Sequence, residues 1–353
     1  MAKQIVNSLI QKLEISSEEY KKAESIANSL ASHISNCDMI KDRGPELYIQ
    51  GSFKLGTVVK PIDSTQKFDI DIVCVLASDS KDNITKDELK KVIGDTLKTH
   101  PILGSKFKPK PRCWCAEIDE QFKVDVVPAI ADRDSNNGGI LIQDKYETRW
   151  QHTNPKAYFK WFDERRKMRL VVKNSVQDGV DMSNLEDDIK MPLQVAVQIL
   201  KRMRDYHFRN NPDFKPSSII LTTIAATYYN GEPDALNALN SIISKMPLYD
   251  KGEIDISYNG ENFADQLNVK GSESRRKAFI GFLKEVKELW PRICDAKYIE
   301  DAKIPMSLGF GPEMAKSVLD NGDMGLDKKV IVTPQKVLLG SQDKLAKPWL
   351  SNL

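Results

Sequence analysis

The first 40 residues carry the apolar spacing of amphipathic helices. Apolar side chains recur three or four positions apart in two runs, Ile5 to Leu13 and Ala23 to Ile34, which places each run on one helix face. Between the runs, Ser16 to Glu19 looks like the start of a helix with acidic residues in its first turn. The pattern predicts an N-terminal helical segment over residues 1–40.

Residues 41–150 have a different character, because short apolar runs alternate with turns. The apolar run 68–76 is interrupted only by two aspartates, and a later pair of runs is joined by an acidic turn. Runs of this length and composition are typical of strands. The expected elements are strands over 68–76, 112–118 and 122–127 and a helix over 86–97, and a short apolar run over 47–49 precedes them.

From residue 151 onward, apolar positions recur mostly at helical spacing. Helices are expected over 155–167, 191–206, 216–229 and 279–290, the last stopped by Pro291. The fold class that follows is α/β in the mixed α+β sense. A core over 41–150 is joined to a helical lobe over 151–330, with a tail over 331–353 and a cleft between the two lobes.

The overall charge argues against a grip on long nucleic acid. The chain has 52 basic and 50 acidic residues, a net charge of +2, whereas proteins that bind long polymers usually carry a marked basic excess. The basic cluster Arg165 to Arg169 is interpreted as a solvated helix face. Small nucleotides need only a few local cations, so the charge balance favours a nucleotide substrate over a polymer.

Cysteine use and hydropathy favour a soluble cytoplasmic protein. The five cysteines are odd in number and scattered, which is typical of reduced thiols rather than a disulfide framework. The N-terminus lacks a charged region followed by an apolar one, and no apolar stretch is long enough to span a bilayer. We expect no membrane association.

Asp69 and Asp71 are the first candidate catalytic residues. Side chains alternate along a strand, so both carboxylates project from one face while Phe68, Ile70 and Ile72 point into a core. Two neighbouring carboxylates repel each other unless a cation lies between them, and the local sequence offers no basic partner on that face. A divalent metal is the economical solution, and oxygen ligands suit Mg²⁺, with Mn²⁺ as the alternative.

The segment before these aspartates has the features of a phosphate-binding loop. Gln50 precedes Gly51 and Ser52, and Lys54 lies close by. A glycine allows close approach of the backbone to a phosphate, and a helix that started here would direct its N–H groups at the anion. We therefore expect Gln50, Gly51 and Ser52 to bind the substrate's phosphates.

Asp125 is the third candidate. It is a lone acidic residue in the apolar run Phe122 to Val127, where Lys123 shares its strand face. Taken alone, Asp125 is better explained as a solvent-facing strand residue. Together with Asp69 and Asp71, it completes the ligand set of a two-metal site.

These motifs resemble the DNA polymerase β-like nucleotidyltransferases, and most closely their bacterial cGAS/DncV-like branch. The shared pattern is Gly-Ser, then Asp-x-Asp, then a distant third Asp. The resemblance covers roughly residues 45–230 and is carried by QGSFKLGTVV, FDIDIV, FKVDVVPA, WQHTNPKAYFKWF and KPSSIILTT. The spacing between Ser52 and Asp69 is longer than in the minimal superfamily pattern.

The resemblance implies a cytoplasmic enzyme that makes a cyclic di- or trinucleotide from ATP, GTP or pyrimidine nucleoside triphosphates. The active site would lie in the cleft, and the product would switch on a separate effector protein in bacterial anti-phage signalling. By position, Lys201 and Ser218 match family residues that contact the donor triphosphate. Their alternative roles are an exposed helix lysine and a helix cap. A zinc ribbon for DNA sensing is missing, and we expect a monomer that long nucleic acid does not activate.

Two other functions share the same motif. One is a different polymerase β-like reaction, such as linear 2′–5′ oligoadenylate synthesis or nucleotidylation of an RNA end or a small molecule. The other is a nucleotide-binding protein without catalytic activity. The sequence does not separate these from cyclic nucleotide synthesis, because all of them can retain the aspartates. Base choice, ring linkage and activating signal also stay open.

Overall fold

The fold was analysed in a computed structural model that describes every residue except 64, 136, 144–148, 169–189 and 321–353. The chain divides into two units, each with its own internal packing. One comprises Met1–Glu14 and the described residues from Phe162 onward, and the other comprises Ile15–Trp161. The expected tail over 331–353 lies outside the described residues.

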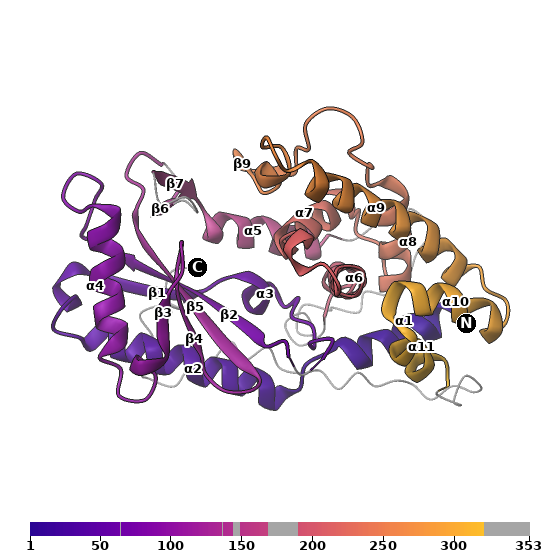
Figure 1. Cartoon of the computed structure of the whole chain (residues 1–353), viewed down its shortest axis with the longest axis horizontal. Coiled ribbons are helices and arrows are strands. Elements are labelled where there is room, and N and C mark those ends of the chain that lie inside the picture. The colour runs from indigo at the N-terminus through magenta and orange to yellow at the C-terminus, as the bar shows by residue number, and fades with distance from the viewer. Residues whose placement is uncertain (64, 136, 144–148, 169–189, 321–353) are drawn as a thin grey trace, which may run out of the picture. The chain divides into compact units, whose positions relative to one another are not determined.

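The second unit is built around one mixed sheet, which is drawn in indigo to magenta in Figure 1. Its strands lie in the order β1-β2-β5-β4-β3, and β6 and β7 extend it from β5. Strands β2 and β5 are parallel, and every other neighbouring pair is antiparallel. The strands are β1 (Pro45–Ile49), β2 (Phe68–Leu76), β3 (Phe107–Pro109), β4 (Trp114–Glu117), β5 (Phe122–Ala131), β6 (Ile140–Gln143) and β7 (Trp150–Thr153).

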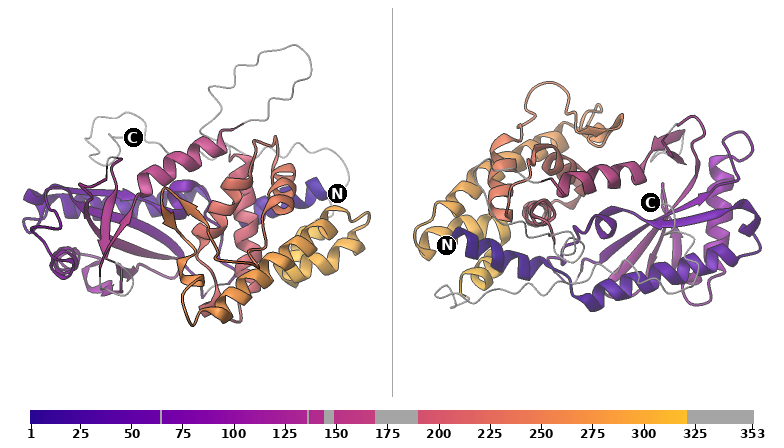
Figure 2. Two further views of the ribbon diagram at one scale, coloured as in Figure 1. Left: turned by 90° about the horizontal axis from the view of Figure 1, so that it is seen from above. Right: turned by 180° about the vertical axis from the view of Figure 1, so that it is seen from behind.

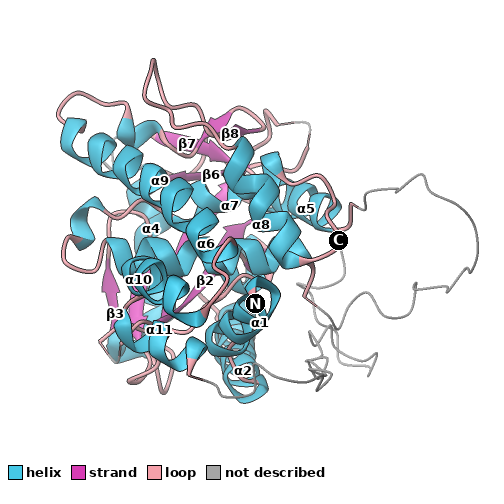
Figure 3. Ribbon diagram, turned by 90° about the vertical axis from the view of Figure 1, so that its right-hand side faces the viewer, coloured by secondary structure: helices cyan, strands magenta, loops and turns pink. Residues whose placement is uncertain are grey.

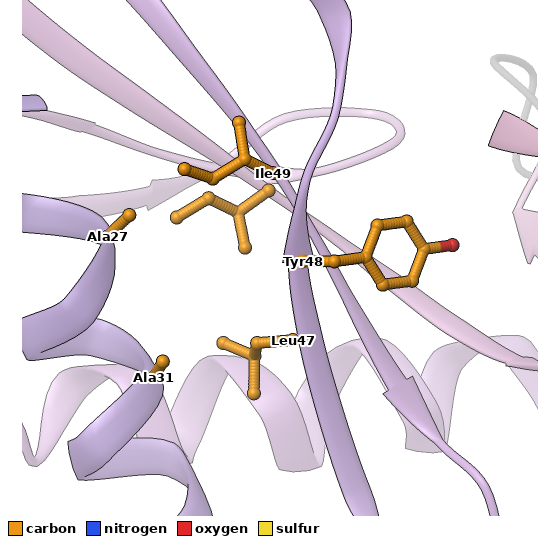
Figure 4. A pocket seen from close by; sticks show the side chains of 6 residues that line it. Ala27, Ala31, Leu47, Tyr48 and Ile49 are labelled. Carbon is orange, nitrogen blue, oxygen red and sulfur yellow. The ribbon is translucent and has the colours of Figure 1, made fainter. Parts of the chain in front are cut away.

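One face of this sheet is apolar and covered by helices. Alternate residues of β2, including Ile70 and Ile72, are fully buried there against α2 (Ser17–Asn36) and α4 (Lys86–Lys98). In Figure 4, Leu47 and Ile49 of β1 point toward α2, while Tyr48 points to the opposite side. The small gap between α2 and β1 is lined almost entirely by apolar side chains, so it offers no charged group for a nucleotide.

Both covering helices begin at capping boxes. The Ser16 side chain accepts the Glu19 N–H while Glu19 accepts the Ser16 N–H, and Thr85 and Glu88 repeat the arrangement. Such reciprocal bonds satisfy N–H groups that a helix start otherwise leaves unpaired. The predicted helix start at Ser16 to Glu19 is therefore confirmed.

The first unit is helical apart from a short two-stranded ribbon, as Figure 3 shows. Helix α6 contacts α1, α7, α8, α9 and α10, and its apolar face forms part of the core. The bounds are α1 (Ala2–Leu13), α5 (Pro155–Arg166), α6 (Pro192–His207), α7 (Ser218–Tyr228), α8 (Ala235–Lys245), β8 (Ser257–Tyr258), β9 (Glu261–Asn262), α9 (Glu273–Cys294), α10 (Ile299–Phe310) and α11 (Pro312–Leu319), with α5 crossing the boundary between the units.

A partly buried ion pair joins the end of α1 to the start of α6. The Lys190 ammonium lies within 2.6 Å of both carboxylate oxygens of Glu14, and the Gln198 amide donates a further hydrogen bond to Glu14. Burial lowers the pKa of Lys190, and Glu14 acts in the opposite sense. A buried ammonium is tolerated only with such a partner, so the first helix packs with distant residues rather than with its neighbour α2.

Two expectations about element boundaries are wrong. Pro291 does not stop a helix, because α9 continues to Cys294. The turn after Pro291 is held by the buried Ile293 and by a hydrogen bond from the Asp295 N–H to the Pro291 carbonyl. The expected strands also end too early in the chain, because β6 and β7 follow β5 and add to the sheet. Views from above and from behind show this extension in Figure 2.

The buried His100 makes the sheet unit sensitive to acid. Its Nδ1 accepts the N–H groups of Ile102 and Leu103, and Ser29 contacts its Nε2. Burial, followed by the charge of His33, lowers the pKa of His100 from 6.5. The unfolded chain therefore takes up a proton at higher pH than the folded chain does. His100 contributes stability above about pH 6.5, and this is lost as the pH falls toward its folded pKa.

We predict that His100→Asn flattens this dependence, because an amide oxygen can replace Nδ1 as acceptor without titrating. The free energy of unfolding should be measured by urea denaturation between pH 7.5 and 5. The wild-type protein should lose up to about 1.4 kcal/mol more per pH unit than the variant below pH 6.5. Equal slopes for the two proteins would contradict the role of His100.

Candidate metal and nucleotide site

Three aspartates converge on the face of the sheet opposite α2 and α4. The parallel pairing of β2 with β5 places Asp71 beside Asp125, and Asp69 lies two residues earlier on the same face of β2. One carboxylate oxygen from each lies within 4.8 Å of the other two. Among the described residues, no other three His, Cys, Asp or Glu side chains converge in this way.

Lys123, which was expected to share the strand face of Asp125, also reaches Asp69. The pairing that aligns Asp71 with Asp125 also aligns Asp69 with Lys123. The Lys123 ammonium lies 2.7 Å from Asp69 Oδ2 and 3.8 Å from Asp125 Oδ2. The segment around Asp69 and Asp71 itself contains no basic partner, and Lys123 supplies one from the neighbouring strand. Local sequence cannot reveal a partner that arrives from a neighbouring strand.

The electrostatics of Lys123 favour its charged form. Burial alone would lower the pKa of Lys123, but the charge of Asp69, its hydrogen bond and the charge of Asp125 together raise the pKa above the usual value. Three carboxylates and one ammonium leave the cluster with a formal charge of −2. This net charge matches one divalent cation.

The donor atoms also fit a hard divalent cation. Asp125 Oδ1 is buried and accepts no hydrogen bond from the residues that the structure describes. A buried carboxylate oxygen without a donor is costly, and a cation would remove that cost. The converging ligands are all oxygens, the type that Mg²⁺, Mn²⁺ and Ca²⁺ prefer. Asp69, Asp71 and Asp125 can therefore hold a metal of this class.

Two thiols border the cluster without entering its ligand set. Cys115 on β4 is paired with Asp125 on β5. Burial, then the hydrogen bond and charge of Asp125, raise the pKa of Cys115 to about 11. Burial, then Asp125, raise the pKa of Cys113 to about 12. Both thiols stay protonated at neutral pH, and a protonated thiol is a poor metal ligand.

Gly51 brings the chain close to the cluster. Its backbone has φ of +64°, and a Cβ added there would overlap the Asp71 carboxylate. The preceding Gln50 N–H donates a 2.9 Å hydrogen bond to the Asp71 carbonyl. Helix α3 (Gly51–Leu55) begins at this point, with Gln50 as its N-cap. Only glycine fits this conformation and this space without strain.

Ser52 and Lys54 lie on α3, immediately after this contact. Ser52 is half-buried, and its carbonyl accepts the N–H of Thr57, which closes the turn after the helix. The Lys54 ammonium lies 4.4 Å from the ring centre of Phe159 on α5, in a cation–π contact. The glycine, serine and lysine of the predicted phosphate loop are thus on one short helix that starts against Asp71.

The remaining two predicted site residues belong to the helical unit. Lys201 lies on α6 with only 5% of its surface exposed, which excludes the alternative of an exposed helix lysine. Ser218 is the first residue of α7, whose N-cap is Ser217, so Ser218 does not cap the helix. Both residues belong to the helical unit, whereas the three aspartates belong to the sheet unit.

The sequence did not reveal the buried ion pair between Arg204 and Asp205, which contacts the segment before Ser218. The Arg204 guanidinium binds Asp205 Oδ1 through Nε at 2.9 Å and through a terminal nitrogen at 2.6 Å. Arg204 also donates to the Pro216 carbonyl, and Lys215 lies 3.6 Å from Asp205. These contacts fasten the segment that leads into Ser218 to helix α6.

Comparison with known proteins agrees with this geometry. Residues 1–166 match the Second Messenger Oligonucleotide or Dinucleotide Synthetase domain. A c-di-GMP synthase from Roseivirga ehrenbergii is 31% identical over 277 residues, which span 75% of this chain and 72% of that protein.

Solved structures show the same fold. The CD-NTase CdnG of Bradyrhizobium diazoefficiens, in complex with GTP, superposes with a TM-score of 0.72 over 91% of this chain and 99% of that one, at 15% identity. DncV of Escherichia coli, bound to 3′-deoxy GTP, has a TM-score of 0.62 over 88% of this chain and 95% of that one, also at 15% identity. The predicted nucleotidyltransferase fold in the mixed α+β class is confirmed. The domain match, the curated relative and the shared fold show that this chain belongs to the cGAS/DncV-like nucleotidyltransferases, a family of cyclic oligonucleotide synthases.

Proposed function

We propose that this enzyme joins nucleoside triphosphates into a cyclic di- or trinucleotide, with Mg²⁺ held by Asp69, Asp71 and Asp125. The observation that carries the proposal is the convergence of these three carboxylates on one sheet face, directly beside the tight backbone at Gly51. Mn²⁺ is the alternative ion, because it accepts the same oxygen ligands.

The chemistry is a series of nucleotidyl transfers, two for a cyclic dinucleotide and three for a cyclic trinucleotide. A ribose hydroxyl of one nucleotide attacks the α-phosphate of another, an O–P bond forms, and the bond to the β-phosphate breaks as pyrophosphate leaves. The last transfer of the same kind closes the ring and releases another pyrophosphate. Bound divalent ions would lower the pKa of the attacking hydroxyl and offset the charge that builds up on the phosphate.

The protein's own part is to position these groups. The strands hold the carboxylates at fixed spacing, because the opposite faces of β2 and β5 are locked into the core. Gln50, Gly51 and Ser52 are proposed to bind phosphate oxygens, with Lys201 and Ser218 contacting the donor triphosphate from α6 and α7. No side chain forms a covalent intermediate, so positioning and charge stabilisation supply the rate enhancement.

GTP is the substrate that the relatives favour. The curated relative is a c-di-GMP synthase, and both solved structures named above hold guanine nucleotides. We therefore propose GTP as at least one of the joined nucleotides. The test is incubation with all four ribonucleoside triphosphates, Mg²⁺ and no nucleic acid, with mass spectrometry of the products. A cyclic product containing guanine is expected, whereas linear 2′–5′ oligonucleotides would replace this proposal with the alternative function.

The cellular role follows from the same chemistry. We propose a cytoplasmic monomer whose product switches on a separate effector protein in anti-phage signalling. The described helices include none with the length and hydropathy that a bilayer span requires. With a net charge of +2, we expect no strong binding or activation by long DNA or RNA. Turnover that rises steeply on adding long duplex, and falls again at high salt, would reveal a basic surface.

We predict that the double variant Asp69→Asn, Asp71→Asn abolishes product formation and leaves the fold intact. Two neutral amides keep the size of the side chains but remove the charge that attracts the metal. Product yield should be measured together with the melting temperature. The matched control is Asp42→Asn with Asp82→Asn, since both are exposed carboxylates of the same unit. Mg²⁺-dependent synthesis that survived in the first variant would refute the assignment.

Gly51→Ala is predicted to lose most activity. The new methyl group would force either the Asp71 carboxylate or the loop out of place. Gly252→Ala is the control, because Gly252 has nearly the same φ of +67° but open space around it. Both variants bear similar backbone strain, so only the first should lose more than about tenfold in kcat/KM. Equal losses would show that strain, not the contact with Asp71, limits Gly51.

Asp125→Asn should reduce kcat far more than nucleotide affinity. Asp125 is proposed to serve the attacking hydroxyl, whereas Asp69 and Asp71 also receive the ion that accompanies the triphosphate. An interaction that matters mainly in the transition state affects kcat, and losing such a charge commonly costs about a hundredfold or more. Steady-state kinetics and calorimetric binding of a non-hydrolysable GTP analogue would check this. A near-normal kcat would leave Asp125 as an ordinary strand residue.

A further inference from the structure

Lys123 sits where a metal ion's positive charge would act. Its ammonium is hydrogen-bonded to Asp69 Oδ2 at 2.7 Å and lies 3.8 Å from Asp125 Oδ2. About a third of the Lys123 side chain is exposed, compared with 40% for Asp69 and 22% for Asp125. The group therefore lies among the carboxylates but keeps contact with solvent, which allows it to move.

The strand neighbours of Lys123 do not supply another anion for it. Glu117 on β4 is directly paired with Lys123 in register. The Glu117 carboxylate, however, binds the Lys67 ammonium at 2.8 Å on the exposed side of the sheet. Among the described residues, Lys123 forms ion pairs with Asp69 and Asp125.

We propose that Lys123 is a positioning residue that substitutes for the metal's charge before the metal binds. Its ammonium offsets the mutual repulsion of the three carboxylates and keeps them together in the metal-free protein. The same charge repels an incoming divalent ion and occupies an oxygen that the ion needs. Lys123 therefore lowers the affinity for the metal but keeps the carboxylates in place before the metal binds. This inference rests on the proposed function, since it takes the aspartates as metal ligands.

The proposed role predicts that removal of the Lys123 ammonium changes stability and metal affinity in opposite directions. Removing the ammonium takes away a positive charge that is bound to Asp69 and lies close to Asp125, so the metal-free protein should become less stable. It also removes a positive charge beside the metal site, so a divalent ion should bind more tightly. If Lys123 merely supported the fold, its removal would lower both the stability of the metal-free protein and its affinity for the metal.

The experiment uses the full chain, stripped of metal with a chelator and kept free of nucleotide. Mn²⁺ alone is the probe, and its unbound concentration is followed by electron paramagnetic resonance during titration. Lys123→Met, which keeps an unbranched apolar stem but lacks the terminal ammonium, should bind Mn²⁺ about tenfold more tightly than the wild-type protein. Its metal-free melting temperature should fall by about 2–4 °C, and saturating Mn²⁺ should restore it.

Two further variants isolate the charge at this position. Lys123→Arg retains the charge and should resemble the wild type in both measurements. Lys67→Met removes a neighbouring positive charge whose partner is Glu117, so it should leave Mn²⁺ affinity nearly unchanged. If Lys123→Met does not fold without metal, Lys123→Gln provides the same neutral comparison with a polar side chain.

The outcomes separate this inference from the proposed function. Mn²⁺ that binds the wild type through Asp69 and Asp71, but binds the neutral Lys123 variants equally or more weakly, would overturn the role of Lys123 alone. If the double variant Asp69→Asn, Asp71→Asn bound Mn²⁺ as tightly as the wild-type protein, the aspartates would not be the ligands. That result would overturn both the role of Lys123 and the proposed function. Tighter binding together with lower metal-free stability would support the inference.

Discussion

The parallel pairing of β2 with β5 is the constraint on which the site depends. It places Asp71 beside Asp125 and Asp69 beside Lys123, so four charged groups from distant parts of the sequence share one small surface. A slip of one residue in this register would turn Asp125 and Lys123 toward the helices. The apolar residues that alternate with them prevent such a slip, because Phe122, Val124 and Val126 are fully buried on the other face.

This arrangement separates stability from chemistry within the same strands. In β2 and β5, alternate side chains are buried in the core beneath α2 and α4, and the side chains between them include the charged groups of the site. The three carboxylates repel one another, and Lys123 reduces this repulsion. Apolar packing on the opposite face of the sheet stabilises the strands against what remains of it. The positive φ of Gly51 belongs to the same design, since the backbone must pass within contact distance of Asp71.

Much of the catalytic face could be predicted because strand alternation is a local property. The pattern around Asp69 and Asp71 gave the bounds of β2 and the shared direction of both carboxylates correctly. The partnership of Lys123 with Asp69 could not be predicted, because it depends on which strands are neighbours and in what register. The same limit explains why β6 and β7 were missed, since both are short and depend on pairing, β6 with the end of β5 and β7 with β6. Pro291 failed as a stop signal because tertiary burial of Ile293 outweighs one lost hydrogen bond. The lobe boundaries and the contacts of Lys201 and Ser218 with a triphosphate stay predictions.

The most direct test of the proposed metal site is anomalous diffraction from crystals grown with Mn²⁺ and a non-hydrolysable GTP analogue. The ion-binding role of the triad predicts manganese peaks bounded by the carboxylate oxygens of Asp69, Asp71 and Asp125, at about 2.1–2.2 Å from them. It also predicts that the Lys123 ammonium has moved away from Asp69 Oδ2. Anomalous peaks that lie elsewhere, or a bound nucleotide with no manganese between these aspartates, would contradict the metal-dependent mechanism.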